Sequence, residues 1–258
     1  MQGLTEFLPV SSSGHLILVS QFLGWEDQGQ TIDVAIHIGS LLAVVIYFSK
    51  DLLHMGKDLT KSCLLPNNKY PLSKLFWLIV AATIPVIIVG YFVAKSGAAW
   101  LRSPEIIGWS ILLFGIVLYI ADKIGMTIRK CKHLDINDAM IIGLSQCLAL
   151  IPGTSRSGIT MTAARFLGME RCEAAKFSML LSIPTILGAG ILIGYEIYSA
   201  GNIVFTHSIL SAIIYSFAAS IVSIYAMMCW LKTSSFTPFV IYRIILGIIL
   251  ILISKNII

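Results

Sequence analysis

The sequence predicts an all-α polytopic membrane protein, and three observations support this fold class. Of the 258 residues, 57% are hydrophobic and 12% are charged, whereas an average soluble domain carries roughly 25% charged residues. The mean hydropathy of +0.88 excludes a soluble fold. Uncharged stretches such as residues 177–195 and 197–231 have the length, about 20 residues, that an apolar helix needs to cross a bilayer.

Six segments are predicted to be full transmembrane helices, because each is close to the length that the bilayer requires. They cover residues 32–49, 73–95, 104–121, 174–198, 206–230 and 236–254. The first residues lack the pattern of a cleavable signal peptide, so we expect these segments to direct membrane insertion themselves.

Loop charges predict the orientation. Residues 50–74 and 122–138 carry most of the loop lysines and arginines, and such residues concentrate in cytoplasmic loops. Both loops are therefore expected in the cytoplasm, and the acidic loop with Glu26 and Asp27 on the outer face. The net charge of +5 is explained by these loops and does not indicate nucleic-acid binding.

Two further apolar regions, residues 1–23 and 139–168, are interrupted in the middle by Pro, Gly and Ser. We interpret both as re-entrant segments made of two half-helices. Following the charge rule through the chain, the first enters from the outer side and the second from the cytoplasm. Broken helices in such folds meet near the bilayer midplane, where irregular backbone must be buried in protein or line an aqueous cavity.

The two interrupted regions also resemble each other. Gly3-Leu4-Thr5-Glu6 matches Gly143-Leu144-Ser145-Gln146, and the turn glycines Gly14 and Gly158 are each followed eight residues later by Phe-Leu-Gly. The sequence therefore predicts one membrane domain made of two inverted-topology repeats. The first repeat covers about residues 1–121 and the second about residues 139–258.

The first turn places hydroxyls at a helix start, since Ser11, Ser12 and Ser13 precede Gly14 and His15. A helix N-terminus favours anions, and Ser12 and His15 share a face at i, i+3 spacing. This pattern predicts a nucleophile and a proton carrier. The alternative is that the serines only cap the helix, but an ionisable histidine within a membrane segment favours a functional role.

Glu6 lies among apolar residues, where an unpaired carboxylate is costly. It is a candidate ligand for a divalent cation, since Mg²⁺ commonly takes one or two carboxylates plus substrate phosphates, or a group that orients His15. The alternative is an ion pair with a buried arginine, for which Arg156 and Arg243 are the candidates.

The second turn predicts an anion cradle. Arginine binds phosphate oxygens through two parallel hydrogen bonds, and glycines let backbone amides approach the anion. The candidate residues are Gly153, Thr154, Ser155, Arg156, Ser157, Gly158 and Thr160. The alternative is a capped kink whose arginine reaches the membrane surface.

Several other polar and aromatic residues are expected to be structural. His37 is expected to bond a neighbouring backbone group, and Arg243 to be a counter-ion. The tryptophans lie near span ends or loops, as interfacial aromatic residues do. They are Trp25, Trp77, Trp100, Trp109 and Trp230.

Two motifs resemble those of the undecaprenyl-diphosphatase family, also called bacitracin-resistance proteins. They are Gln2-Gly3-Leu4-Thr5-Glu6-Phe7-Leu8-Pro9-Val10-Ser11-Ser12-Ser13-Gly14-His15 and Pro152-Gly153-Thr154-Ser155-Arg156-Ser157-Gly158-Ile159-Thr160. The spacing and the number of spans agree over essentially the whole chain. The resemblance implies metal-dependent hydrolysis of undecaprenyl diphosphate, a membrane-embedded C55 isoprenoid, to the monophosphate and inorganic phosphate. It also implies an inner-membrane protein whose site opens towards the periplasm, and a homodimer.

The resemblance implies a role for each motif residue. Gln2 and Glu6 fill the family's metal-binding (E/Q)xxxE element, which takes Mg²⁺ or Ca²⁺, and Ser12 corresponds to the nucleophile. His15 corresponds to the proton carrier, and Arg156 forms the diphosphate clamp with the hydroxyls of Ser155, Ser157 and Thr160. Direct attack by water with His15 as the base uses the same residues.

Two points set this chain apart from a simple match. Family members usually have about a dozen apolar residues before the first motif, whereas Met1 directly precedes Gln2 here, so we expect a shorter first half-helix.

A transporter or flippase for a lipid phosphate is the alternative function, because inverted repeats with broken helices are a common transporter design. A transporter needs the anion clamp but has no use for a nucleophile beside a base.

Overall fold

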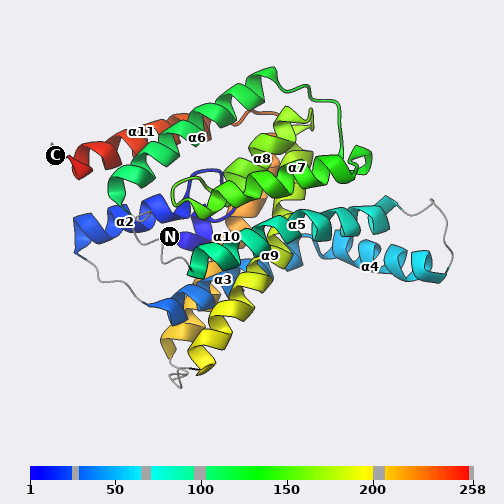
Figure 1. Ribbon diagram of the computed structural model, residues 1–258, viewed down its shortest axis with the longest axis horizontal. Coiled ribbons are helices and arrows are strands. Elements are labelled where there is room, and N and C mark those ends of the chain that lie inside the picture. The colour runs from blue at the N-terminus through cyan, green and yellow to red at the C-terminus, as the bar shows by residue number, and fades with distance from the viewer. Residues whose placement is uncertain (25–28, 65–70, 96–102, 200–206, 256–258) are drawn as a thin grey trace.

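The computed structural model describes residues 1–24, 29–64, 71–95, 103–199 and 207–255, which form helices, turns and a single isolated β-bridge between Arg129 and Met169 (Figure 1). The fold class expected from the sequence is confirmed. The elements are α1 (Gln2–Thr5), α2 (Ser12–Leu23), α3 (Gln30–Tyr47), α4 (Ser49–Leu64), α5 (Pro71–Lys95), α6 (Pro104–Ile124), η2 (Cys131–His133), α7 (Ile136–Gln146), η3 (Cys147–Leu150), α8 (Arg156–Phe166), α9 (Arg171–Ser199), α10 (His207–Leu231) and α11 (Thr237–Ser254). Glu26, Asp27, Trp25 and Trp100 lie outside the described residues.

Five of these helices, α5, α6, α9, α10 and α11, are long and apolar enough to cross a membrane. Between 22% and 39% of the residues in their apolar windows are buried inside the protein, and part of each span remains exposed. The exposed side chains include Trp77, Ile84 and Phe92. Large apolar side chains on the outside of a helix bundle are expected to contact lipid.

The sixth predicted span, residues 32–49, differs from the expectation. It corresponds to α3, which ends at Tyr47 and meets α4 at a bend of 73°. Taken together, α3 and α4 are long and apolar enough to form a sixth span that is broken at this bend. The predicted cytoplasmic loop 50–74 begins with the helix α4. This helix buries Met55 and partly buries Leu52 and Leu59, a one-sided apolar stripe typical of an amphipathic helix.

Two helix pairs flank the broken segments. α3 packs along α10, and α6 packs along α11, which lie side by side at the upper left of Figure 1. Glycine allows α6 and α11 to come close to each other, because a Cβ on Gly108 would lie 3.1 Å from the carbonyl oxygen of Gly247. Small residues at such contacts let helix backbones come close in membranes.

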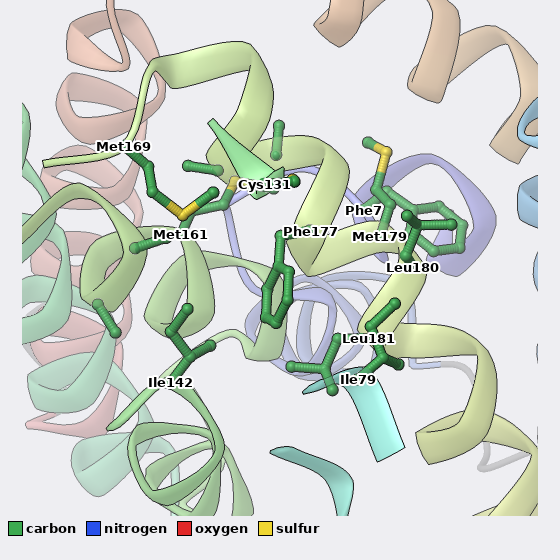
Figure 2. Close-up of a cluster of buried hydrophobic side chains, with 14 of the residues drawn as sticks. Phe7, Ile79, Cys131, Ile142, Met161, Met169, Phe177, Met179, Leu180 and Leu181 are labelled. Atoms are coloured by element: carbon green, nitrogen blue, oxygen red, sulfur yellow. The ribbon is translucent and has the colours of Figure 1, made fainter. Parts of the chain in front are cut away.

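A buried apolar cluster supports the broken segments from one side. It takes side chains from α5, α7, α8 and α9 and includes Ile79, Ile142, Met161 and Phe177 (Figure 2). Phe7, from the first turn, is 1% exposed and belongs to the same cluster. Its burial therefore anchors the first turn to helices of the second half of the chain.

A buried ionic cluster closes one end of the bundle. Asp122 accepts hydrogen bonds from the side chains of Arg165 and Arg171 at 3.2 and 2.7 Å, and from the backbone nitrogen of Phe236 at 3.1 Å. Nearby, Lys176 pairs with Asp51. These contacts join the starts of α4, α9 and α11 to the end of α6, so these four helix ends lie at the same end of the molecule.

Candidate active site

The two broken segments turn through the same unusual backbone conformation. Ser11 has φ 72° and Ser155 has φ 69°, and they are the non-glycine residues with positive φ in the described chain. Each lies three residues before its turn glycine, at the N-cap of α2 and α8 respectively. Residues other than glycine are strained there, and such strain clusters at functional sites.

The two turns are hydrogen-bonded to each other in a matching way. The hydroxyl of Ser13 accepts from the backbone nitrogen of Gly153 at 3.0 Å. The equivalent hydroxyl of Ser157 donates to the carbonyl oxygen of Leu8 at 2.9 Å. Each turn thus uses the second residue of its helix, a serine, to hold the other turn.

Glu6 connects the two predicted motifs. Its Oε1 atom pairs with Nη2 of Arg156 at 3.1 Å, and the two side chains are only 11% and 15% exposed. Its Oε2 atom accepts a hydrogen bond from the hydroxyl of Ser12 at 3.3 Å. The ion pair with Arg156 that the sequence left open is therefore present. The Nη1 atom of Arg156 is buried and has no hydrogen-bond partner.

His15 is not bonded to Ser12, the pairing that the i, i+3 spacing suggested. Its Nδ1 atom lies 2.7 Å from the carbonyl oxygen of Ser11, and its Nε2 atom lies 2.6 Å from the hydroxyl of Tyr242. The two rings are stacked, with centroids 5.4 Å apart. The sequence analysis missed Tyr242, whose only signal was its place beside Arg243 in the last span.

Arg243 differs from the counter-ion expected of it. It is fully buried, and no carboxylate of the described chain lies within ion-pair distance. Its guanidinium instead donates to four backbone carbonyls, those of Ile111, Pro9, Gly153 and Thr154. An arginine fork suits several acceptors at once, and here it ties both turns to α6 and α11.

The remaining residues of the predicted cradle divide into two groups. Ser155 caps α8 by accepting from the backbone nitrogen of Gly158 at 3.1 Å, and Thr160 bonds Ser178 at 2.6 Å inside the protein. These hydroxyls are used for structure. Thr154 is also fully buried, but its hydroxyl has no hydrogen-bond partner, so a donor is left over at the second turn.

Gln2 supplies a further polar group near the first turn. Its amide nitrogen lies 3.2 Å from Nε2 of His37, and His37 also bonds the carbonyl oxygen of Asp33, as expected. The Oε1 atom of Gln2 is buried without a partner. Among the described residues there is no group of three or more His, Cys, Asp or Glu side chains that could hold a metal.

These features define an α-helical multi-pass membrane protein with a polar centre between two broken helices. A family model described as bacitracin resistance protein BacA matches residues 1–249. An undecaprenyl-diphosphatase of Jannaschia sp. is 49% identical over 98% of this chain and 95% of the relative. Undecaprenyl-diphosphatases of Dinoroseobacter shibae and Chromohalobacter salexigens are 48% and 45% identical over at least 97% of this chain and 94% of each relative. The chain belongs to the BacA family.

Proposed function

We propose that the chain hydrolyses undecaprenyl diphosphate to undecaprenyl phosphate and inorganic phosphate. The observation that carries the proposal is the Ser12–Glu6–Arg156 arrangement, in which a hydroxyl, a carboxylate and a cation with a free donor meet between the two turns. Family membership and the names of the relatives support the same activity.

The diphosphate binds to donors that the fold leaves unpaired. The free Nη1 atom of Arg156 and the hydroxyl of Thr154 are both available to phosphate oxygens. The start of α2 adds backbone amides, because Ser11 makes no side-chain cap there and the first amides of a helix otherwise lack partners. Their combined positive potential stabilises the charge that builds up in the transition state.

The hydroxyl oxygen of Ser12 attacks the terminal phosphorus in line. An oxygen–phosphorus bond forms, the bridging bond breaks, and the lipid monophosphate leaves with the electron pair. Glu6, hydrogen-bonded to this hydroxyl, is placed to take its proton. Water then attacks the phosphoserine and releases inorganic phosphate, while His15 carries a proton to or from the reacting groups. Direct attack by water remains the competing route.

Mg²⁺ or Ca²⁺ is the proposed cofactor, and the donor set fits such an ion. Both prefer oxygen ligands, and Mg²⁺ commonly takes one or two protein groups plus phosphate oxygens. The carboxylate of Glu6 and the unpartnered Oε1 atom of Gln2 would hold it. A bound divalent ion would neutralise phosphate oxygens, and Arg156 would share that task through its unpartnered Nη1 atom.

The cellular setting follows from the substrate. The lipid phosphate is the carrier for peptidoglycan synthesis, so its recycling supports cell-wall formation and cell shape, and hydrolysis of the diphosphate confers bacitracin resistance. The proposal places the protein in the inner membrane, with the site open towards the periplasm. The orientation rests on the basic loops, because lysine- and arginine-rich loops favour the cytoplasmic side. A homodimer is part of the same proposal.

The proposal is tested by phosphate release from undecaprenyl diphosphate by the purified chain in detergent, with and without EDTA. Release should require the divalent ion and should fall by at least 100-fold in Ser12→Ala and Arg156→Ala. Ser211→Ala is the matched control, because this exposed serine on α10 bonds the carbonyl oxygen of His207 in its own helix, and its loss should leave the rate unchanged.

Absence of release from the unmodified chain would contradict the hydrolase proposal and favour the transporter alternative. Release that persists in Ser12→Ala but is lost in His15→Ala would keep the function and replace serine attack by direct attack of water.

A further inference from the structure

The hydrogen bonds around His15 determine where its protons lie. The carbonyl oxygen of Ser11 can only accept, so the Nδ1 atom, 2.7 Å away, must carry a hydrogen. In the neutral ring the Nε2 atom is then an acceptor, and the hydroxyl of Tyr242 at 2.6 Å is its donor. Both ring nitrogens are engaged by protein groups, and one tautomer is selected.

Tyr242 also restricts the ring's position. The two rings stack at a centroid distance of 5.4 Å and an interplanar angle of 11°. The next residue on α11, Arg243, bonds the carbonyls of both turns, so the backbone that carries Tyr242 is fixed relative to the site. The position of His15 is therefore set from α11 as well as from α2.

We propose that Tyr242 is a positioning residue for the proposed hydrolysis, which acts by holding His15 in its Nδ1-protonated form, so that Nε2 is the ring nitrogen that can take a further proton. The proposal rests on the proposed function and adds a residue outside the two motifs. A hydroxyl suits this place because it can donate and accept. When Nε2 takes a proton, the same hydroxyl can turn and accept a hydrogen bond from it, so the ring stays in place in both protonation states.

Tyr242→Phe keeps the stacked ring and removes only the hydroxyl. We expect it to lower kcat about tenfold, the effect of one lost hydrogen bond in the transition state, with KM changed less than twofold. In a double-mutant cycle, Tyr242→Phe should add no further loss to His15→Ala, because Tyr242 acts through His15. Tyr119→Phe is the control. Tyr119 lies on α6 at 40% exposure, close to the 44% of Tyr242, and contacts Lys123 away from the site.

A second readout does not depend on activity. In ¹⁵N NMR spectra of the chain labelled at histidine, Tyr242→Phe should shift the Nε2 resonance of His15 and leave its Nδ1–H resonance in place. An unchanged Nε2 resonance would overturn the proposal, as would an unchanged kcat or a loss that adds fully to that of His15→Ala. If the unmodified chain releases no phosphate, the hydrolase proposal fails, and the NMR experiment alone decides the role of Tyr242.

Discussion

At the scale of single residues, the two N-cap serines combine opposing energetic effects. Both adopt positive φ, which disfavours a side chain with Cβ by about 1–2 kcal/mol. Only Ser155 gains a cap in return, through the nitrogen of Gly158, whereas Ser11 makes no cap bond. The strain is thus least compensated at the turn that carries Ser12.

Replacement by glycine separates these effects. Ser11→Gly should stabilise the protein by about 1 kcal/mol, since glycine adopts positive φ freely, and Ser155→Gly should do so by a few tenths less, because the cap is lost. Ser103 is the control: it caps α6 from an extended conformation with φ −66°, so Ser103→Gly should lower stability. Thermal unfolding in detergent measures all three, and no gain from Ser11→Gly would contradict the strain argument.

The same scale shows what the sequence could and could not predict about the site. The motifs identified Glu6, Ser12 and Arg156, because charges and hydroxyls among apolar residues stand out. The pairing of Ser12 with Glu6 instead of His15 was not predictable from i, i+3 spacing, since the direction of the His15 ring depends on Tyr242, more than 200 positions away in the chain. The role of Arg243 depends equally on carbonyls from three other segments.

At the scale of elements, the first halves of the two broken segments approach a neighbouring helix through equivalent glycines. A Cβ on Gly3 would lie 2.7 Å from the carbonyl oxygen of Ser216 on α10. A Cβ on Gly143 would lie 2.8 Å from Cα of Ala82 on α5. The internal sequence match between Gly3 and Gly143 thus corresponds to matching contacts with two different spans.

Gly143→Ala should therefore destabilise the protein by about 1–3 kcal/mol, the usual effect of overpacking, although alanine is the better helix former. Gly190→Ala on α9 is the matched control, because a Cβ there meets nothing within 4 Å. This variant should therefore be more stable than the unmodified chain by the full difference in helix propensity between alanine and glycine. Equal unfolding temperatures for the two variants would contradict this prediction, because they would show that α5 and α7 can move apart without a loss of stability.

The start of α7 carries an ion pair whose effect depends on pH. Arg129 donates to both carboxylate oxygens of Asp138, and Asp138 also accepts from the backbone of Asp135. Burial raises the pKa of Asp138, but the hydrogen bonds from Arg129 and Asp135 outweigh it, so the pKa lies below the usual value. The pKa of Arg129 is raised by its hydrogen bond to Asp138.

Because the folded pKa of Asp138 is the lower one, its stabilising effect is complete above the unfolded pKa of about 3.9 and is lost as the pH falls through the folded pKa. Asp138→Asn should lower the unfolding temperature at pH 7, and the gap to the unmodified chain should narrow below about pH 4. A gap that is constant between pH 7 and pH 3 would exclude a charge effect.

At the scale of the whole molecule, hydropathy predicted five of the six spans and the two interruptions, because each depends on local composition. It did not predict α4, whose lysines and aspartates resemble a loop until packing on α5 reveals the apolar stripe with Met55. The buried Asp122–Arg165–Arg171 cluster was missed for a similar reason, since these charges neutralise each other only in the folded bundle.

The positions of the helix ends of α4, α9 and α10 predict which of them face the cytoplasm. Lys57 and His207 are both exposed, and the ion pair of Asp51 with Lys176 places α4 beside the start of α9, whose other end leads to α10. In a chain with its five cysteines replaced by serine, His207→Cys should react with a membrane-impermeant maleimide applied to whole spheroplasts. Lys57→Cys should react only after lysis, and the reverse pattern would invert the proposed orientation.

The position of Tyr242 and Arg243 on the last helix has a consequence for biosynthesis. Both broken segments leave the ribosome before α11, yet some of the bonds that hold their turns together come from α11, because Arg243 donates to carbonyls of both turns. A nascent chain that stops short of α11 lacks these contacts and the group that holds His15. The centre is therefore completed only after α11 has been synthesised and has packed on α6, so chains terminated before α11 should lack a fully formed site.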